Sequence, residues 1–367
     1  MRMSGRALRL TAGIVLLGVF LLVLPLVLDP FRLNLLGQFL CYAIVALGLD
    51  LLWGYAGILS MGQSVFFGLG AYAFGMYLKM ESAGGKLPDF MSWSGLEHLP
   101  GFWMPFANPA FALFTAVLGP ALVGGLIGYL LSRTRVSGVY FAIITQALAF
   151  IATTLFIGQQ PYTGGTNGLT NFVTIFGAPL NDPGVQAALY RVTVVVLATC
   201  LLLGRGLAHS RFGTLLVALR DDEKRVRFSG YDPALPRAAV FAIAAGVAGL
   251  GGALYAPQVG IVNPDSLGII LGIQMVIWVT VGGRGTLYGG VLGALAVSAA
   301  QTAVSESYPE VWQYAIGALF ILSVLLFPNG LVGLLRSGSR LPRRLARPAP
   351  PAAAPLAEPA DTARVGA

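Results

Sequence analysis

Long apolar runs, separated by short polar or glycine-rich breaks, occupy the chain from residue 8 to residue 334. A helix needs about 20 predominantly apolar residues to cross a bilayer, and several of these runs approach that length. We predict ten spans, near residues 8–28, 34–53, 62–79, 108–131, 138–157, 187–204, 238–256, 267–282, 289–305 and 312–334. The predicted fold class is an all-α, polytopic integral membrane protein with about ten transmembrane helices.

The end of the apolar pattern divides the chain into two regions. Residues 1–335 form the predicted transmembrane domain, and after Leu335 the composition changes abruptly to Arg, Pro and Ala. Such a segment has too little apolar surface to form a core. We therefore predict a disordered cytoplasmic tail over residues 336–367.

Composition supports the membrane interpretation. The chain is 56% hydrophobic and 10% charged, with a mean hydropathy of +0.77, whereas soluble domains carry about 25% charged residues. The net charge is +8. In a membrane protein this surplus is explained by basic cytoplasmic loops, so we predict no nucleic-acid partner.

The distribution of Lys and Arg predicts the orientation. With the N-terminus inside, the inner segments hold the basic residues of loops 133–135, 205–237 and 284 and of the tail, whereas the outer side holds only Arg32, Lys79, Lys86 and Arg191. Basic residues accumulate on the cytoplasmic side. Both termini are therefore predicted to be cytoplasmic, in agreement with an even number of spans.

The sequence lacks the motifs of an enzyme. Lys86 is followed by Leu87 where a phosphate-binding loop needs Ser or Thr. His98 and His209 lie on opposite sides of the predicted membrane, and both cysteines fall within spans. We predict no catalytic residue, no metal site and no cofactor.

Asp50 is essentially the one acid within the predicted spans. An ionisable residue at membrane depth suggests function, such as a proton site. The alternative, which we favour, is a carboxylate that reaches the interface or accepts hydrogen bonds from the glycine-rich turn that follows it.

The segment 211–237 contains the densest charge cluster in the chain. Its apolar residues Phe212, Leu215, Leu216, Leu219 and Val226 fall on one face of a helix. A solvated surface helix would account for the stripe alone. A docking helix for a cytoplasmic partner also accounts for the concentration of mixed charges, and we favour it.

Four motifs carry a resemblance to a known family: "GYAGILSMGQSVFFGLGAY", "TGGTNGLT", "FGTLLVALRDDEKRVRFSGYDP" and "GGRGTLYGGVLGA". In this order they resemble the membrane subunits of branched-chain amino acid and urea-type ABC importers, over most of residues 34–334. Within that group, "YAPQVGIVNP" and "VGGRGTLYGG" look most like the urea permease of the LivM-like type. Gln63 stands where many relatives have histidine.

The resemblance implies a non-catalytic permease subunit in the bacterial inner membrane, translocating urea or a short amide while separate subunits hydrolyse ATP. It implies a second, LivH-like permease, two cytoplasmic ATP-binding subunits and a periplasmic substrate-binding protein. Residues Ala218, Leu219, Arg220, Asp221 and Asp222, with Gly230, match the family's coupling loop. The alternatives are a branched-chain amino acid importer permease and a self-sufficient channel or carrier.

Several residues in or beside the spans are candidates for the translocation path: Gly57, Ser60, Gln63, Phe67, Gln146, Gln274 and Trp278, with Asn34, Gln38 and Thr145 as further polar candidates. A neutral amide substrate needs hydrogen-bond donors and acceptors of this kind. Each polar residue could instead form a helix–helix hydrogen bond.

The glycine-rich stretch 54–72 matches a second segment. Gly57-Ile58-Leu59-Ser60 aligns with Gly260-Ile261-Val262-Asn263, each just after a span. Interrupted spans in corresponding halves point to a transport path, so spans 2–5 and 7–10 are a possible inverted repeat. In the alternative, the glycines only permit close helix packing.

Overall fold

The computed structural model describes residues 18–134, 138–308, 310, 314, 317–318, 321 and 330–337. The regular secondary structure of this part of the chain is helical apart from a short hairpin of β1 (Thr174–Ile175) and β2 (Ala178–Pro179) and an isolated bridge between Leu169 and Val262. The predicted all-α class is confirmed.

Eight of the ten predicted spans, the second to the ninth, coincide with long helices in the described residues. These are α3 (Pro30–Asp50) with its π-helical continuation η2 (Leu51–Tyr55), α4 (Gln63–Ser82), α6 (Pro109–Arg133), α7 (Val139–Gly158), α9 (Pro183–Ala208), α12 (Ala234–Val259), α13 (Ile269–Gly282) and α14 (Tyr288–Ser307). Five segments are long and apolar enough to cross a membrane, namely Pro30–Tyr55, α6, α7, α9 and α12.

Shorter elements lie between and beyond these helices: η1 (Val19–Val23), α2 (Leu24–Val27), α5 (Asp89–Trp93), η3 (Met104–Ala107), α8 (Gln160–Thr163), η4 (Gly165–Asn167), α10 (Arg211–Asp221), α11 (Glu223–Phe228), η5 (Pro264–Leu267) and α16 (Gly330–Ser337). The first predicted span lies partly on η1 and α2. Most of the tenth span, and residues 338–367 of the predicted tail, lie outside the described residues.

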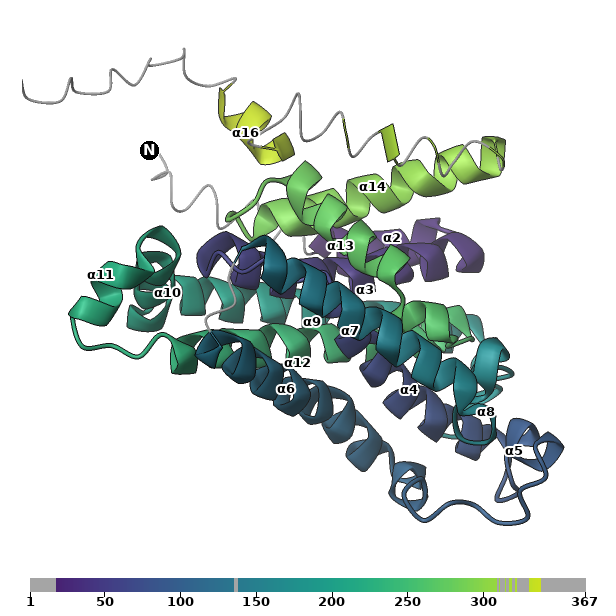
Figure 1. The fold of residues 1–367 in the computed structure, drawn as a ribbon. Helices are drawn as coiled ribbons and strands as arrows, with labels where there is room; N and C mark the ends of the chain where they lie inside the picture. The colour runs from purple at the N-terminus through teal and green to yellow at the C-terminus, as the bar shows by residue number, and fades with distance from the viewer. Residues whose placement is uncertain are drawn as a thin grey trace, which may run out of the picture.

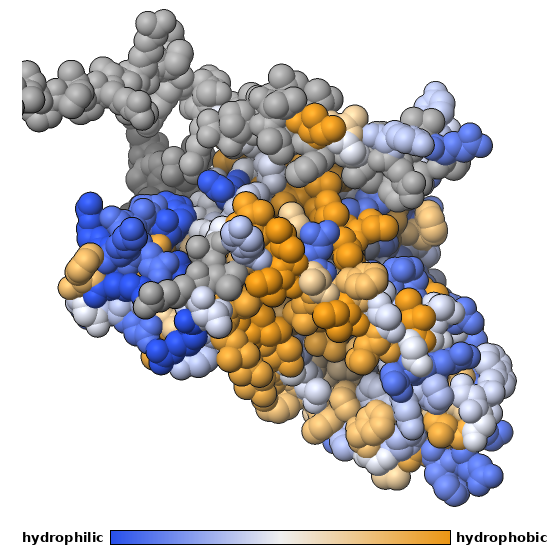
Figure 2. Space-filling model, viewed as in Figure 1, coloured by the Kyte–Doolittle hydropathy of each residue, from blue (hydrophilic) through white to orange (hydrophobic). Residues whose placement is uncertain are grey.

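The helices form an elongated bundle with α10 and α11 at one end and α5 and α8 at the other (Figure 1). Figure 2 shows an apolar band across the visible face, between two polar ends. Large side chains of α6 and α7 are exposed on the bundle surface, among them Phe114 at 61% and Ile151 at 61%. Such contiguous apolar surface is expected where a protein faces lipid.

Helix α12 is central, because it packs against α6, α4 and α3. The close approach depends on small residues: a side chain at Gly70 would collide with the backbone carbonyl of Gly249, and one at Gly252 with that of Phe67. In membranes, helix association relies on such close packing because lipid supplies no hydrophobic driving force between helices. The glycines of the 54–72 stretch therefore serve packing at Gly70, as one of our two interpretations predicts.

Two segments separate consecutive long helices inside the bundle. The first break, residues 56–62, lies between η2 and α4, and the second break, residues 260–268, lies between α12 and α13. With 14 residues, α13 is about 21 Å long at 1.5 Å per residue, shorter than a hydrocarbon core of about 30 Å. The starts of α4 and α13 meet: Ser64 Oγ donates to the Leu267 carbonyl at 3.0 Å. Both helices therefore begin inside the bundle, and the second break enters it from the end opposite to α10.

The two breaks have a common backbone feature at opposite ends of the bundle. Gly57 (φ +72°) and Gly260 (φ +77°) are both left-handed. Gly57 contacts Arg220 of α10, whereas Val262 pairs with Leu169 through two backbone hydrogen bonds of 2.8 and 2.9 Å, near η4. Opposite ends are what an inverted repeat requires, and the rotation relating the two halves stays a prediction.

Candidate functional site

The charged segment folds as two helices, α10 and α11. Leu216 and Leu219 are buried, at 1% and 2% exposure, so the predicted apolar stripe does brace α10 on the bundle. The single helix we predicted is interrupted at Asp222, whose backbone is extended (φ −156°, ψ 91°) and whose carboxylate caps α11 by accepting from Arg225 N at 3.1 Å. Aspartate competes for backbone N–H groups in this way and favours N-caps.

Much of the charge in this segment is paired internally. Glu223 forms ion pairs of 2.9 Å with both Arg227 and Arg237. Arg220 Nε donates to Asp221 at 2.9 Å, and its Nη1 donates to the carbonyl oxygen of Gly54 at 2.7 Å. Arg220 is therefore directed toward the bundle and not only toward a partner.

Other residues of α10 and α11 face away from the bundle. Ala218 and Asp221 are exposed, and Phe228 is 91% exposed at the end of α11. Gly230 follows in a left-handed turn (φ +86°) that ends the segment. Of the predicted coupling residues, Ala218, Arg220, Asp221, Asp222 and Gly230 are exposed, whereas Leu219 is buried.

Asp50 has a structural role at the end of α3. Its side chain is fully buried and accepts hydrogen bonds from Gly285 N at 2.6 Å and Leu287 N at 2.7 Å. The carboxylate thus holds the turn between α13 and α14, in which Leu287 has φ +53°. Asp50 does not reach the interface, and its donors belong to this distant turn and not to the glycine-rich turn that follows it.

These contacts form a continuous series. The exposed surface of α10 is joined through Arg220 to Gly54, which lies one helical turn after Asp50. Gly54 also lies against the backbone of Gly285, within 2.6 Å of where a side chain would begin. A displacement of α10 would therefore be transmitted to the end of α3 and to the α13–α14 turn.

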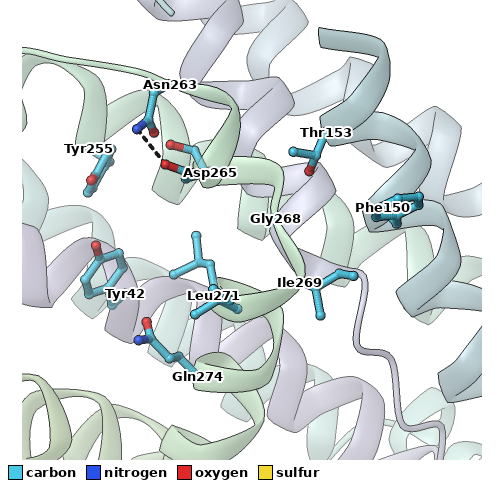
Figure 3. Close-up of a pocket in the computed structure, with 12 residues that line it drawn as sticks. Tyr42, Phe150, Thr153, Tyr255, Asn263, Asp265, Gly268, Ile269, Leu271 and Gln274 are labelled. Carbon is cyan, nitrogen blue, oxygen red and sulfur yellow. Dashed lines mark hydrogen bonds between the residues drawn. The ribbon is translucent and has the colours of Figure 1, made fainter. Parts of the chain in front are cut away.

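A cavity of about 490 Å³ lies beside the second break and the start of α13 (Figure 3). Its polar lining comes from five elements that the fold brings together: Tyr42 of α3, Thr153 of α7, Tyr255 of α12, Asn263, Asp265 and Ser266 of the second break, and Gln274 of α13. Ile269, Ile270 and Leu271 of α13 and Phe150 of α7 supply apolar walls. A volume of this size is typical of small-molecule sites, which range from about 300 to 1,000 Å³.

Two lining residues, Tyr42 and Tyr255, pack against Phe67 and Trp278, which do not line the cavity. We call these four aromatic residues the aromatic floor. Tyr42 stacks on Trp278 with ring centroids 4.7 Å apart, and Phe67 meets Tyr255 edge-on at 5.1 Å. Phe67 and Trp278 are completely buried. The structure therefore brings together three predicted path residues, with Gln274 in the cavity and Phe67 and Trp278 in the aromatic floor.

The other predicted path residues do not line the large cavity. Ser60 and Gln63 are buried, and their side chains find no hydrogen-bond partner in the described part of the chain. Gly57 lines a separate cavity of about 70 Å³ near Arg237. Gln146 is half-buried on α7 and is not part of the cavity lining.

Of the three further polar candidates, Thr145 and Gln38 form hydrogen bonds, and Asn34 forms no side-chain hydrogen bond with a described residue. Thr145 Oγ1 accepts from Met61 N at 3.1 Å, which is the inter-element hydrogen bond of our alternative interpretation. Gln38 donates to the Tyr42 hydroxyl at 2.9 Å and so supports the cavity lining indirectly. Asn34 is half-buried and does not line the cavity.

Sequence reasoning missed Tyr42, Tyr255 and Asp265. The predicted spans 238–256 and 267–282 place Asp265 in an outer loop between them. The available signal was length: the second of these spans has too few residues to cross a bilayer. The preceding segment must therefore enter the membrane to complete the crossing.

An all-helical bundle with an apolar band, interrupted helices and a polar cavity between them defines a multi-pass membrane permease. The family described as branched-chain amino acid transport system / permease component matches residues 31–324. The chain belongs to this family of ABC importer permeases.

Three relatives illustrate the similarity. The chain is 26% identical over 324 residues to the high-affinity branched-chain amino acid transport system permease protein LivM of Escherichia coli (strain K12), covering 82% of this chain and 69% of that protein. It is 22% identical over 295 residues to BraD of Pseudomonas aeruginosa and 23% identical over 312 residues to LivH of Salmonella typhimurium, each covering 80% of this chain and 91% of the relative. No solved structure matches.

Proposed function

We propose that this chain is a permease subunit of an ABC importer for aliphatic amino acids in the bacterial inner membrane. The family match over residues 31–324 carries this proposal, since it includes both the α10–α11 segment and the cavity. The names of the relatives favour the branched-chain alternative of our sequence analysis over urea.

The urea hypothesis rested partly on the motif "VGGRGTLYGG", and the structure offers a packing reason for its glycines. A side chain at Gly282 would collide with the Gly289 carbonyl, and the Gly285 N–H donates to Asp50. These residues form the α13–α14 turn and do not line the cavity. The motif therefore has a packing role that does not depend on the substrate.

The partners follow from the same proposal. A second, LivH-like permease would complete the path, one of two ATP-binding subunits would dock on α10 and α11, and a periplasmic binding protein would deliver the substrate. The exposed Phe228 at the end of α11 is the kind of aromatic anchor that dominates protein interfaces. In this arrangement α10 and α11 lie in the cytoplasm, and so do both termini.

Reconstitution tests the proposal. Proteoliposomes containing both permeases and both ATP-binding subunits, with the binding protein outside, should accumulate labelled leucine when ATP is enclosed. They should not accumulate labelled urea above the level of vesicles without ATP. Accumulation of urea but not leucine would reinstate the urea hypothesis, and flux through this chain alone would favour the channel alternative.

A further inference from the structure

The carboxylate of Asp265 is the one charged group among the described residues that line the large cavity. In Figure 3 it lies beside Asn263, whose Nδ2 donates to Asp265 Oδ2 at 3.0 Å. No described residue donates a side-chain hydrogen bond to the other oxygen, and none of the ion pairs in the described part of the chain includes Asp265. The cavity thus presents a carboxylate without a cation from the described residues.

Asp265 is solvent-exposed, so its carboxylate is accessible to a ligand that enters the cavity. The segment after α12 enters the bundle, because Leu267 contacts Ser64 in the first turn of α4 and α13 is too short to span the membrane. Ionisable groups at membrane depth are expensive, face water-filled cavities and mark substrate pathways. A carboxylate in such a cavity attracts cations and repels anions.

The remaining lining limits the kind of cation. Ile269, Ile270 and Leu271 form an apolar wall along the first turn of α13, and Phe150 contributes another from α7. This wall suits an aliphatic group and offers nothing to a bare metal ion, which requires several oxygen ligands. No group of three or more metal-ligating side chains occurs in the described residues.

We propose that the cavity is a substrate site of the permease, in which Asp265 binds the α-ammonium group of an aliphatic amino acid and the α13 wall contacts its side chain. This inference rests on the proposed function and names the group that the site recognises. Neutral urea could donate a hydrogen bond to Asp265, but it has no positive charge for the carboxylate to attract. The charge therefore separates the two substrate classes.

Replacement of the charge alone tests the inference. In the reconstituted complex, Asp265→Asn retains the size of the side chain and removes its charge, so leucine uptake should fall at least about tenfold, as expected for a lost charge-assisted interaction. Asp265→Glu should retain most of the uptake. The control is Glu97→Gln, which removes an exposed carboxylate of an outer loop remote from the cavity lining.

ATP hydrolysis by the complex without binding protein should be the same for all variants, which shows that they fold and assemble. Wild-type leucine uptake by Asp265→Asn, or an equal loss in Glu97→Gln, would overturn the inference and leave the proposed function standing. A wild-type complex that accumulates no leucine would instead overturn the proposed function.

Discussion

Arg220 of α10 and Gly54 of η2 are joined by a hydrogen bond of 2.7 Å between the guanidinium Nη1 and the backbone carbonyl oxygen. The bond crosses from the exposed α10–α11 surface to the end of the α3–η2 segment. In a π-helix the carbonyl groups are displaced from the regular i to i−4 pattern, so Gly54 can accept from a side chain. This is a direct polar link between the predicted docking helix and the bundle.

Removal of this link should separate ATP hydrolysis from transport. We expect Arg220→Ala to reduce ATP-driven uptake at least about tenfold in the reconstituted complex, because charged hydrogen bonds contribute about 1.5–3 kcal/mol. ATP hydrolysis should continue. Arg32→Ala is the control, since the Arg32 side chain is 52% exposed and its ion pair in the described residues is with Glu306, away from α10 and α11. Undiminished uptake by Arg220→Ala would show that the link is not used.

Asp50 should be important for stability. In Asp50→Asn, one amide N–H group would face Gly285 N or Leu287 N, and we expect a loss of about 2 kcal/mol or more in the free energy of unfolding. Thermal unfolding in detergent measures it. Asp182→Asn is the control, because Asp182 is an exposed N-cap that Asn replaces well. Equal midpoints for the two variants would contradict the assigned role.

Alanine substitution at two glycines separates the effect of backbone strain from the effect of contact with Arg220. Gly57 and Gly84 are both left-handed, at φ +72° and +58°, but only at Gly57 would an added Cβ meet a neighbour among the described residues, Arg220 Cγ at 2.6 Å. A left-handed alanine costs about 1–2 kcal/mol, so both alanine variants should unfold more easily. Only Gly57→Ala should also lose uptake, measured in proteoliposomes; similar uptake in both variants would argue against the Arg220 contact.

The α5 end of the bundle should respond to pH through Asp89. This carboxylate is 2.7 Å from Lys79 Nζ. Partial burial raises its pKa, but hydrogen bonds from Lys79 and Phe90 N outweigh burial, so the pKa is lowered from its ordinary value. A lowered pKa adds stability above the unfolded pKa, near 4, and this stability is lost as the pH falls through the folded value.

The unfolding midpoint of the wild type should therefore exceed that of Asp89→Asn at pH 7, and the difference should shrink below about pH 4. Thermal unfolding at about pH 7, 4 and 3 measures it. A difference that grows toward low pH would mean that the sign is wrong.

Phe228 should anchor the ATP-binding subunit. Truncation of an exposed aromatic anchor removes the apolar contact, and we expect Phe228→Ala to weaken association with that subunit about tenfold or more. Co-purification from detergent extracts measures the association. Trp93→Ala is the control, because Trp93 is 79% exposed at the opposite end of the bundle. Loss of association in both variants would indicate general destabilisation.

The long helices were predictable because lipid demands about 20 apolar residues per span, a property of local sequence. The break at Asp222 was also within reach, since aspartate before Glu223 and Lys224 is a favourable N-cap. The hydrogen-bond partners of Asp50 were not predictable, because the donors at Gly285 and Leu287 are 235 and 237 residues away in the sequence.

The cavity also depends on contacts between residues that are far apart in the sequence. Tyr42, Tyr255 and Gln274 have no shared pattern, and only the crossing of α3, α12 and α13 brings them together. Gln274 was predictable because polar residues are rare in spans. Tyrosine gave no such signal, since it is also common at membrane interfaces.

The packing of α4 against α12 also has a consequence for biosynthesis. About 150 residues separate the end of α4 from the start of α12. At about 5–20 residues per second, the ribosome needs roughly 8–30 s to produce this length. Throughout that interval the newly made α4, with its small-residue face and the buried Lys79 near its end, lacks its main neighbour. We expect the insertion machinery to retain α4 until α12 emerges, so that the two halves of the chain enter the lipid as one unit.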